Sequence, residues 1–247
     1  MGARGLLLPL LLAPFSFFGL AQERLSLTLT PVRLELQGAG EGTAQLENTG
    51  VEGVTLEVEA FPFLLRSDGS LYPAPSHERD LCPHLSVFPQ GRVSLGKGES
   101  LLLRVRVQPF AGRGTYWCGV GLTTLPSPRE QGGLQALLRL RLVLPVYLTF
   151  PGTEEPKLEV VGPSPKGDGE LRLLLQNRGN ALLRVSGSLL FYDREGKEVG
   201  RLPVPEVPLL PGGGRTLSFK PEFPRGGYRV LLLLEHPYGR LALEGDW

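Results

Sequence analysis

The sequence has few of the residues on which enzymes and metal centres depend. Its 247 residues include two cysteines, three histidines and a single methionine, Met1. It contains no Gly-x-Ser-x-Gly elbow, phosphate-binding glycine loop, dinucleotide fingerprint or paired-histidine zinc motif. The neighbouring carboxylates Glu154 and Glu155 lie in a predicted turn, where solvated surface is the usual role. We therefore expect a protein that is not an enzyme and that binds no cofactor.

Charge and hydrophobic length argue against two further classes of protein. The net charge is +1 at pH 7 and charged residues make up 21% of the chain, which is unlike a nucleic-acid-binding surface. An apolar content of 41% is too high for a disordered chain and sufficient for packed cores. After the N-terminal leader, no apolar run reaches the ~20 residues of a membrane-spanning helix. We expect a mature chain that binds no nucleic acid and has no stable membrane insertion.

The first 21 residues have the pattern of a signal peptide, which sets the first predicted boundary at residues 1–21. Arg4 gives a positive start, residues 6–18 form an apolar core broken by two prolines, and residues 19–21 supply the small side chains that a signal peptidase reads. An uncleaved N-terminal anchor is the alternative that this pattern leaves open. We expect export to the periplasm or to the outside of the cell.

Glycine and proline are abundant, at 33 and 23 residues, as expected where many short strands are joined by turns. No stretch after the leader has helical periodicity. Residues 95–122 have the clearest strand pattern. Leu101 to Val107 alternates apolar residues with arginine, and Tyr116 to Leu122 is an apolar run after a Pro/Gly connection. We predict that these two runs are adjacent antiparallel strands.

A pattern built around asparagine occurs twice in the chain. Residues 46–50 are Leu-Glu-Asn-Thr-Gly and residues 175–179 are Leu-Gln-Asn-Arg-Gly. Each is followed by a glycine-rich turn that leads into a strand, and later by a tyrosine after glycine that opens an apolar run. This repetition predicts an all-β chain with two β-sandwich domains in tandem. We place the N-terminal domain at residues 22–150, a polar linker at 151–156 and a smaller C-terminal domain at 157–247.

The two cysteines are an even number in a chain that we expect to be exported. This favours a disulfide between Cys82 and Cys118. Such a bridge would stabilise the fold by roughly 3 to 4 kcal/mol in the chain-entropy treatment. Two buried free thiols are the alternative.

His77, Cys82 and His84 are residue types that bind zinc. Their spacing matches no established zinc motif, and prolines lie beside them. We therefore predict an ordinary polar loop and no metal.

Residues 134–150 have the pattern of one strand that is longer than a sandwich needs. Its even positions from Leu134 to Leu144 are all apolar, and it follows a Pro/Gly-rich loop at 126–133 that we expect to be mobile. Two interpretations are open: a core strand that runs into the linker, or a partly open edge that pairs with a partner strand. In the second case the partner-binding residues are Arg33, Leu138, Arg139, Leu140, Arg141 and Leu142.

These features together resemble the pilus periplasmic chaperones, the PapD-like proteins, and related exported bacterial sandwich proteins. The resemblance covers nearly the whole mature chain and implies two immunoglobulin-like β-sandwich domains. A second, smaller sandwich with a Tyr-Gly pair near its end fits the same plan. The matching segments are Thr30-Pro31-Val32-Arg33, Asn48, Gly96-Lys97-Gly98, residues 114–122, residues 134–150 and Tyr238-Gly239.

The resemblance also implies a function. In that family the long last strand of the first domain lends alternating apolar side chains to an incomplete pilin-like or surface subunit. An arginine and a lysine bind the terminal carboxylate of the subunit. Arg33 matches the arginine, whereas residues 134–150 contain no lysine, so Arg139 or Arg141 would substitute. The alternative is an envelope or surface sandwich protein that binds other proteins or glycans without chaperone activity.

Overall fold

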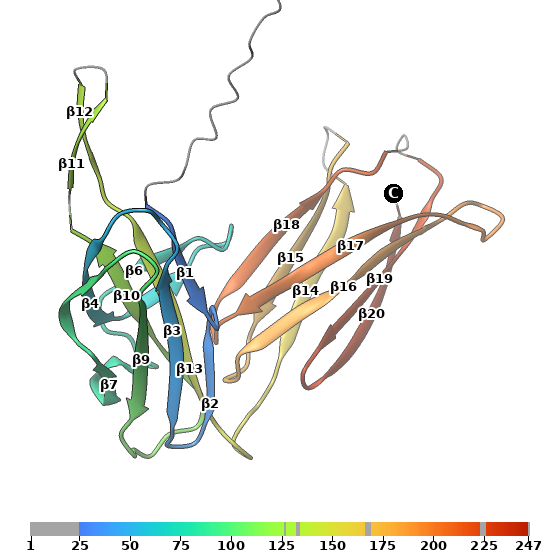
Figure 1. Ribbon diagram of the computed structural model, residues 1–247. Helices are drawn as coiled ribbons and strands as arrows, with labels where there is room; N and C mark the ends of the chain where they lie inside the picture. The colour runs from blue at the N-terminus through green and yellow to red at the C-terminus, as the bar shows by residue number, and fades with distance from the viewer. Residues whose placement is uncertain (1–24, 126, 132–133, 166–168, 223–225, 247) are drawn as a thin grey trace, which may run out of the picture.

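The computed structural model describes residues 25–125, 127–131, 134–165, 169–222 and 226–246, so the predicted signal peptide lies outside the described residues (Figure 1). Within this described part, the regular elements are β-strands and one short 3-10 turn, η1 (Cys82–His84). No helix in the same residues is long and apolar enough to cross a membrane. The prediction of an all-β fold is confirmed.

The first sandwich consists of two sheets and two small hairpins. One sheet has the order β1 (Leu27–Thr30), β3 (Glu41–Asn48), β9 (Ser100–Val107), β7 (Leu85–Phe88). The other has the order β2 (Leu34–Gln37), β13 (Arg141–Phe150), β10 (Gly114–Thr124), β4 (Val54–Phe61), β8 (Gly91–Leu95). The hairpins are β5 (Phe63–Leu65) with β6 (Leu71–Pro73), and β11 (Ser127–Gln131) with β12 (Leu134–Leu138).

The strands face each other with their apolar alternate residues, because successive side chains of a strand point to opposite faces. On β9, Leu103 and Val105 are buried while Arg104 is exposed. On β13, the even positions Leu144 and Leu148 belong to the same core. Each sheet is therefore apolar toward the other and polar over much of its outer face.

The predicted hairpin between residues 101–107 and 116–122 is wrong. β9 pairs with β3 and β7, whereas β10 pairs with β13 and β4 in the opposite sheet. Both runs are apolar enough to be central strands, and such a pattern does not identify the partner. The connection at residues 108–113 carries the chain from one sheet to the other.

Residues 134–150 form two strands instead of the single strand predicted. β12 pairs with β11, and β13 begins after a break at Arg139 and Leu140. Thr124 holds this break, because its N–H donates to the Leu140 carbonyl at 2.8 Å and its Oγ1 accepts from the Leu140 N–H at 2.9 Å. The loop expected at 126–133 thus contributes β11. A strand that outruns its sheet loses its neighbours, so its outer part pairs with the nearest segment of chain.

The second sandwich also consists of two sheets. The smaller has the order β14 (Leu158–Pro165), β15 (Leu171–Asn177), β18 (Gly214–Phe219). The larger has the order β17 (Glu198–Leu209), β16 (Leu183–Tyr192), β19 (Arg229–His236), β20 (Gly239–Asp246). Leu173, Phe191 and Leu232 are fully buried between them. Residues 151–156 lie between β13 and β14, and the boundaries assigned to the domains and the linker stay a prediction.

The repeated asparagine has the same task in both sandwiches. Asn48 Nδ2 donates to the carbonyls of Glu52 and Gly96 at 2.8 and 3.0 Å, and Asn177 Nδ2 donates to those of Ala181 and Leu209 at 2.7 and 2.9 Å. Both side chains are fully buried. Each asparagine therefore ties a glycine turn and a neighbouring loop to the end of a core strand.

Cys82 and Cys118 form the predicted disulfide, so the alternative of two free thiols is wrong. Residues beside the bridge pair with β10 as well, since Leu81 N–H donates to the Trp117 carbonyl at 3.0 Å. The bridge pins the segment before β7 to the central strand of the opposite sheet.

The two histidines near this disulfide stack on aromatic rings. His77 lies 4.6 Å from Trp117 and His84 lies 4.0 Å from Phe110, measured between ring centroids. Among the residues that the structure describes, no group of three or more His, Cys, Asp or Glu is arranged to hold a metal ion.

Candidate strand-binding edge and arginine cluster

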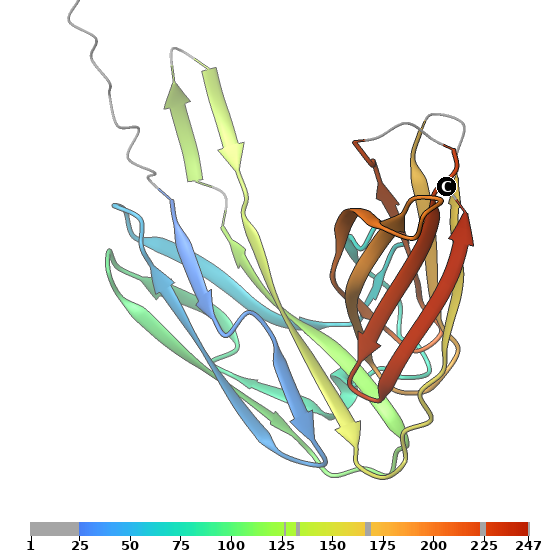
Figure 2. The same cartoon turned by 90° about the vertical axis from the view of Figure 1, so that its right-hand side faces the viewer.

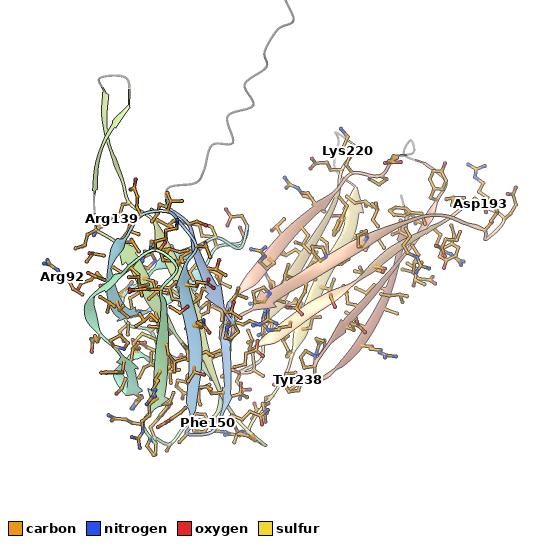
Figure 3. All side chains as sticks on the ribbon, viewed as in Figure 1. Arg92, Arg139, Phe150, Asp193, Lys220 and Tyr238 are labelled. Atoms are coloured by element: carbon orange, nitrogen blue, oxygen red, sulfur yellow. A yellow bond between two sulfur atoms is a disulfide. The ribbon has the colours of Figure 1, made fainter. Side chains whose placement is uncertain are left out.

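Strand β13 has neighbours on both sides along its second half alone. It pairs with β10 from Arg141 to Phe150, whereas β2 covers only Val146 to Thr149. Within the described residues, the other side of Arg141 to Pro145 has no strand neighbour. Figure 3 labels Arg139 and Phe150, which lie toward opposite ends of the first sandwich. The free edge is therefore on the half of β13 that leads to the β11–β12 hairpin.

The odd-numbered residues of β13 direct their backbone groups to this edge. On the β2 side, the Thr149 carbonyl accepts from Gly38, and on the β10 side, the Leu140 carbonyl accepts from Thr124. Because backbone groups alternate in direction along a strand, the N–H groups of Arg141 and Val143 face the free edge. Pro145 has no N–H, so the last position of the edge offers an acceptor alone.

The even-numbered side chains of β13 point between the two sheets. Leu144 is buried, and Leu140 and Leu142 are half-buried. Leu138 belongs to β12, whose backbone pairing is described but whose side chains lie outside the described part of the chain. The apolar row of residues 134–144 thus starts as core at its lower end and continues upward beyond the cover of β2.

Arg141 is turned away from the free edge. Its Nη2 donates to Glu59 Oε1 on β4 at 3.0 Å, and its guanidinium lies 4.1 Å from the centre of the Phe61 ring. Gly121 on β10 leaves the space for this position, because a Cβ there would lie 2.9 Å from the same Nη2. Arg139 is exposed at the break before β13.

Arg33 lies at the foot of the free edge, one residue before β2, in a cluster with Glu35, Arg184 and Glu206. Arg33 Nε donates to Glu35 Oε1 at 3.0 Å, and its Nη2 lies 3.5 Å from Glu206 Oε1. Arg184, on β16 of the second sandwich, donates from Nε to Glu35 Oε1 at 2.5 Å, and its Nη1 lies 3.5 Å from Glu206 Oε1. One arginine from each sandwich therefore shares the same two carboxylates.

Arg184 is the more buried arginine of this charge cluster. Its side chain is 12% exposed, against 42% for Arg33. Its guanidinium lies 5.5 Å from the centre of the Tyr147 ring, and burial raises the pKa of Tyr147. Its Nη2 is 2.5 Å from Glu35 Oε1 but makes no aligned hydrogen bond there or elsewhere among the described residues. The cluster therefore holds a buried donor with unused capacity.

The structure does not bring the predicted arginines together. Arg33 lies beside position 145 of β13, and Arg141 is four residues further along, about 13 Å at the usual rise of a strand. The second cation beside Arg33 is instead Arg184, which our sequence reasoning missed. A single arginine in an apolar strand of the other sandwich carries no local signal that links it to Arg33.

Contacts between the sandwiches hold the charge cluster in place. Phe63, Trp117 and Tyr147 of the first sandwich pack with Leu182 and Leu210 of the second. The carbonyl of Ser67, in the turn between β5 and β6, accepts from the Thr216 N–H on β18 at 2.9 Å. Figure 2 shows the two sandwiches diverging from a common base, with the β11–β12 hairpin at the open end.

No protein-family model matches the chain, and no curated protein matches it. Three solved structures align with nearly its whole length. The class 5 fimbriae chaperone CfaA is 13% identical, with 90% of this chain and 100% of that chain covered and a TM-score of 0.52. A chain of the Acinetobacter baumannii CsuC–CsuE chaperone–tip subunit complex, from archaic chaperone-usher Csu pili, is 13% identical, with coverages of 89% and 97% and a TM-score of 0.50. A chain of the Salmonella enterica SafA pilin–SafB chaperone complex is 14% identical, with coverages of 92% and 99% and a TM-score of 0.50.

These likenesses concern the fold, because identities of 13 to 14% are too low to carry an activity from one chain to another. They agree with the sheets and with the pairing of β13 described above. This chain therefore has the two-domain, PapD-like β-sandwich fold found among the fimbrial chaperones.

Proposed function

We propose that the chain is an exported, non-catalytic chaperone that binds a pilin-like or surface subunit by pairing a strand of the subunit with the free edge of β13. One observation carries this proposal: β2 covers Val146 to Thr149 and leaves Arg141 to Pro145 without a neighbour in the described residues. An uncovered edge promotes aggregation unless a partner uses it. The fold of the fimbrial chaperones supports the same conclusion.

The position of Arg33 indicates the direction of the bound strand. A strand on the free edge lies end to end with β2, which runs parallel to β13, and Arg33 stands at the junction. A parallel strand brings its C-terminal carboxylate to Arg33 and Arg184. An antiparallel strand brings its terminal ammonium to the same two cations, which repel it. The expected ligand is therefore a parallel C-terminal strand with a free carboxylate.

The side chains of β13 have a separate part in this function. Leu140 and Leu142, with Leu138 of β12, supply the apolar row that lies beside the core of the subunit, and Arg139 lies at its rim. Main-chain pairing provides affinity and the alternate side chains fix the register. Arg141 supports the strand through Glu59 and Phe61 and does not anchor the carboxylate.

The place of action that we propose is the periplasm. A disulfide such as Cys82–Cys118 persists in oxidising compartments. The pattern of residues 1–21 indicates export. Both features agree with a chaperone that meets its subunit after secretion.

The test uses a labelled peptide of about eight alternating valine and threonine residues, the length of an ordinary strand. Fluorescence anisotropy compares a peptide with a free C-terminal carboxylate, its amide, and an amide that carries one aspartate. We expect the free acid to bind about tenfold more tightly than either amide, because a charge-assisted bond to arginine is lost. An aspartate amide that binds like the acid would assign the site to side-chain carboxylates.

Arg33→Ala and Arg184→Ala are expected to remove the preference for the acid. Arg92→Ala is the matched control, because Arg92 is 75% exposed, lies on β8 at the far edge of the same sheet and pairs with Glu57 at 3.6 Å. Equal binding of acid and amide to the unaltered chain contradicts the proposal. Binding without any protection of an aggregating subunit would instead favour a surface protein.

A further inference from the structure

Glu206 reaches the charge cluster through an irregularity of β17. Between the pairs Val185–Val207 and Gly187–Val204, β17 has one residue more than β16. Such a bulge changes the direction of the side chains that it carries. Here it accompanies a glutamate that meets Arg33 of the other sandwich.

The contacts of Glu206 are longer than those of Glu35. Glu206 Oε1 lies 3.5 Å from Nη2 of Arg33 and 3.5 Å from Nη1 of Arg184. Glu35 Oε1 lies 3.0 Å from Arg33 Nε and 2.5 Å from Arg184 Nε. Charge-assisted hydrogen bonds have their full strength near 2.8 Å, so about 3.5 Å marks a loose ion pair. Glu206 is also 50% exposed, so it is the carboxylate that leaves more easily.

The charge balance of the cluster makes this difference matter. Two arginines and two glutamates sum to zero, so a third carboxylate that simply joined them would leave a net negative charge. If Glu206 moves out into solvent as the third carboxylate enters, the cluster itself remains neutral. The entering group also finds the buried Nη2 of Arg184, which has no aligned acceptor among the described residues.

We propose that Glu206 occupies the anion subsite between Arg33 and Arg184 and is the internal competitor that the carboxylate of the bound strand displaces. This inference rests on the proposed function and adds a residue that limits it. A carboxylate has to exchange with Glu206, and strand pairing on β13 supplies the additional affinity. Free carboxylates that cannot pair are therefore bound weakly, and the return of Glu206 assists release.

The test is Glu206→Gln, which keeps the size of the side chain and removes its charge. We expect the free-acid peptide to bind about tenfold more tightly to this variant than to the unaltered chain, with little change for the amide, because a competing carboxylate is removed. The matched control is Glu198→Gln on the same strand, which pairs with Arg201 at 3.2 Å away from the cluster and is expected to change neither affinity.

Glu206→Asp separates competition from folding. Its shorter side chain retreats from both arginines, so acid binding is expected to tighten by less than in Glu206→Gln. Unchanged or weaker acid binding to Glu206→Gln, with a melting temperature close to that of the unaltered chain, overturns the inference and makes Glu206 a tie between the sandwiches.

Failure of the proposed function has a different signature. In that case the unaltered chain binds acid and amide equally, and Arg33→Ala changes neither. If Arg33 and Arg184 are required but Glu206→Gln gains nothing, the function stands and the competitor role falls.

Discussion

The two sandwiches treat their edge strands differently, and the difference locates the function. β17, at the edge of the larger sheet of the second sandwich, contains Pro203, Pro205 and Pro208. The free part of β13 has Pro145 at its lower end. Proline offers no N–H to an added strand and is a common way to close an edge. The second sandwich thus blocks strand addition where the first sandwich permits it.

Reduction of the disulfide is the largest expected perturbation, and it separates the two sandwiches. The bridge joins residues 36 apart in the first sandwich, and the chain has no other cysteine. Replacing Cys82 and Cys118 by alanine is expected to lower the free energy of unfolding of the first sandwich by about 3 to 4 kcal/mol. Urea unfolding followed by Trp117 fluorescence in a Trp247→Phe background measures it. A loss below about 1 kcal/mol would contradict the expectation.

The buried asparagines are the next test, and here we expect the sandwiches to respond alike. Asn48→Ala and Asn177→Ala each leave several buried carbonyls without a donor, so each is expected to cost about 2 to 3 kcal/mol. Chemical denaturation of both variants provides the comparison, with Asn180→Ala as an exposed-side-chain reference near the linker. If one variant is tolerated, the two turns are not equivalent.

Closing the open edge should make β13 resemble β17. Val143→Pro removes an N–H that faces the free edge and no bond to β10, so peptide binding is expected to fall at least tenfold or so, with a small change in stability. Leu142→Pro is the contrasting variant, because its N–H faces β10 and its loss unfolds the strand. Peptide anisotropy and thermal melting measure both effects. Unaltered binding by Val143→Pro would show that the edge is not used.

The smallest effect concerns one histidine in each sandwich. Burial lowers the pKa of His77 and of His236 from the usual 6.5. Below pH 6.5 the unfolded chain takes up protons that the folded chain does not, so stability is expected to fall as the pH drops from there through the folded pKa values. His77→Phe keeps the stacking on Trp117 and should flatten the first sandwich's share of this dependence. Melting curves at several pH values would show whether the slope persists.

The sequence predicts those parts of the fold that depend on local pattern. Alternation indicates the strands, the repeated asparagine and glycine turns indicate two sandwiches, and two cysteines in an exported chain indicate the bridge. Strand partners depend on contacts between distant segments, which explains the wrong hairpin between β9 and β10. The break at Arg139 and Leu140 has the same origin, since it depends on where the sheet ends.

The candidate site divides in the same way. Arg33 and the apolar row through Leu140 and Leu142 are visible in the sequence, because each belongs to one continuous pattern. Arg184 and Glu206 are not, because they enter the cluster from the second sandwich through packing and a bulge in β17. No periodicity in either strand connects them with residues 150 positions or so away.

The central claim is that a strand adds to the free edge of β13, and backbone amide exchange tests it most directly. NMR hydrogen exchange is measured on the full mature chain with and without the free-acid valine–threonine peptide. The N–H groups of Arg141 and Val143 are expected to become protected, while those of Leu142 and Leu144, already directed to β10, change little. Exchange at Arg141 and Val143 that stays as fast with saturating peptide as without it would contradict the account.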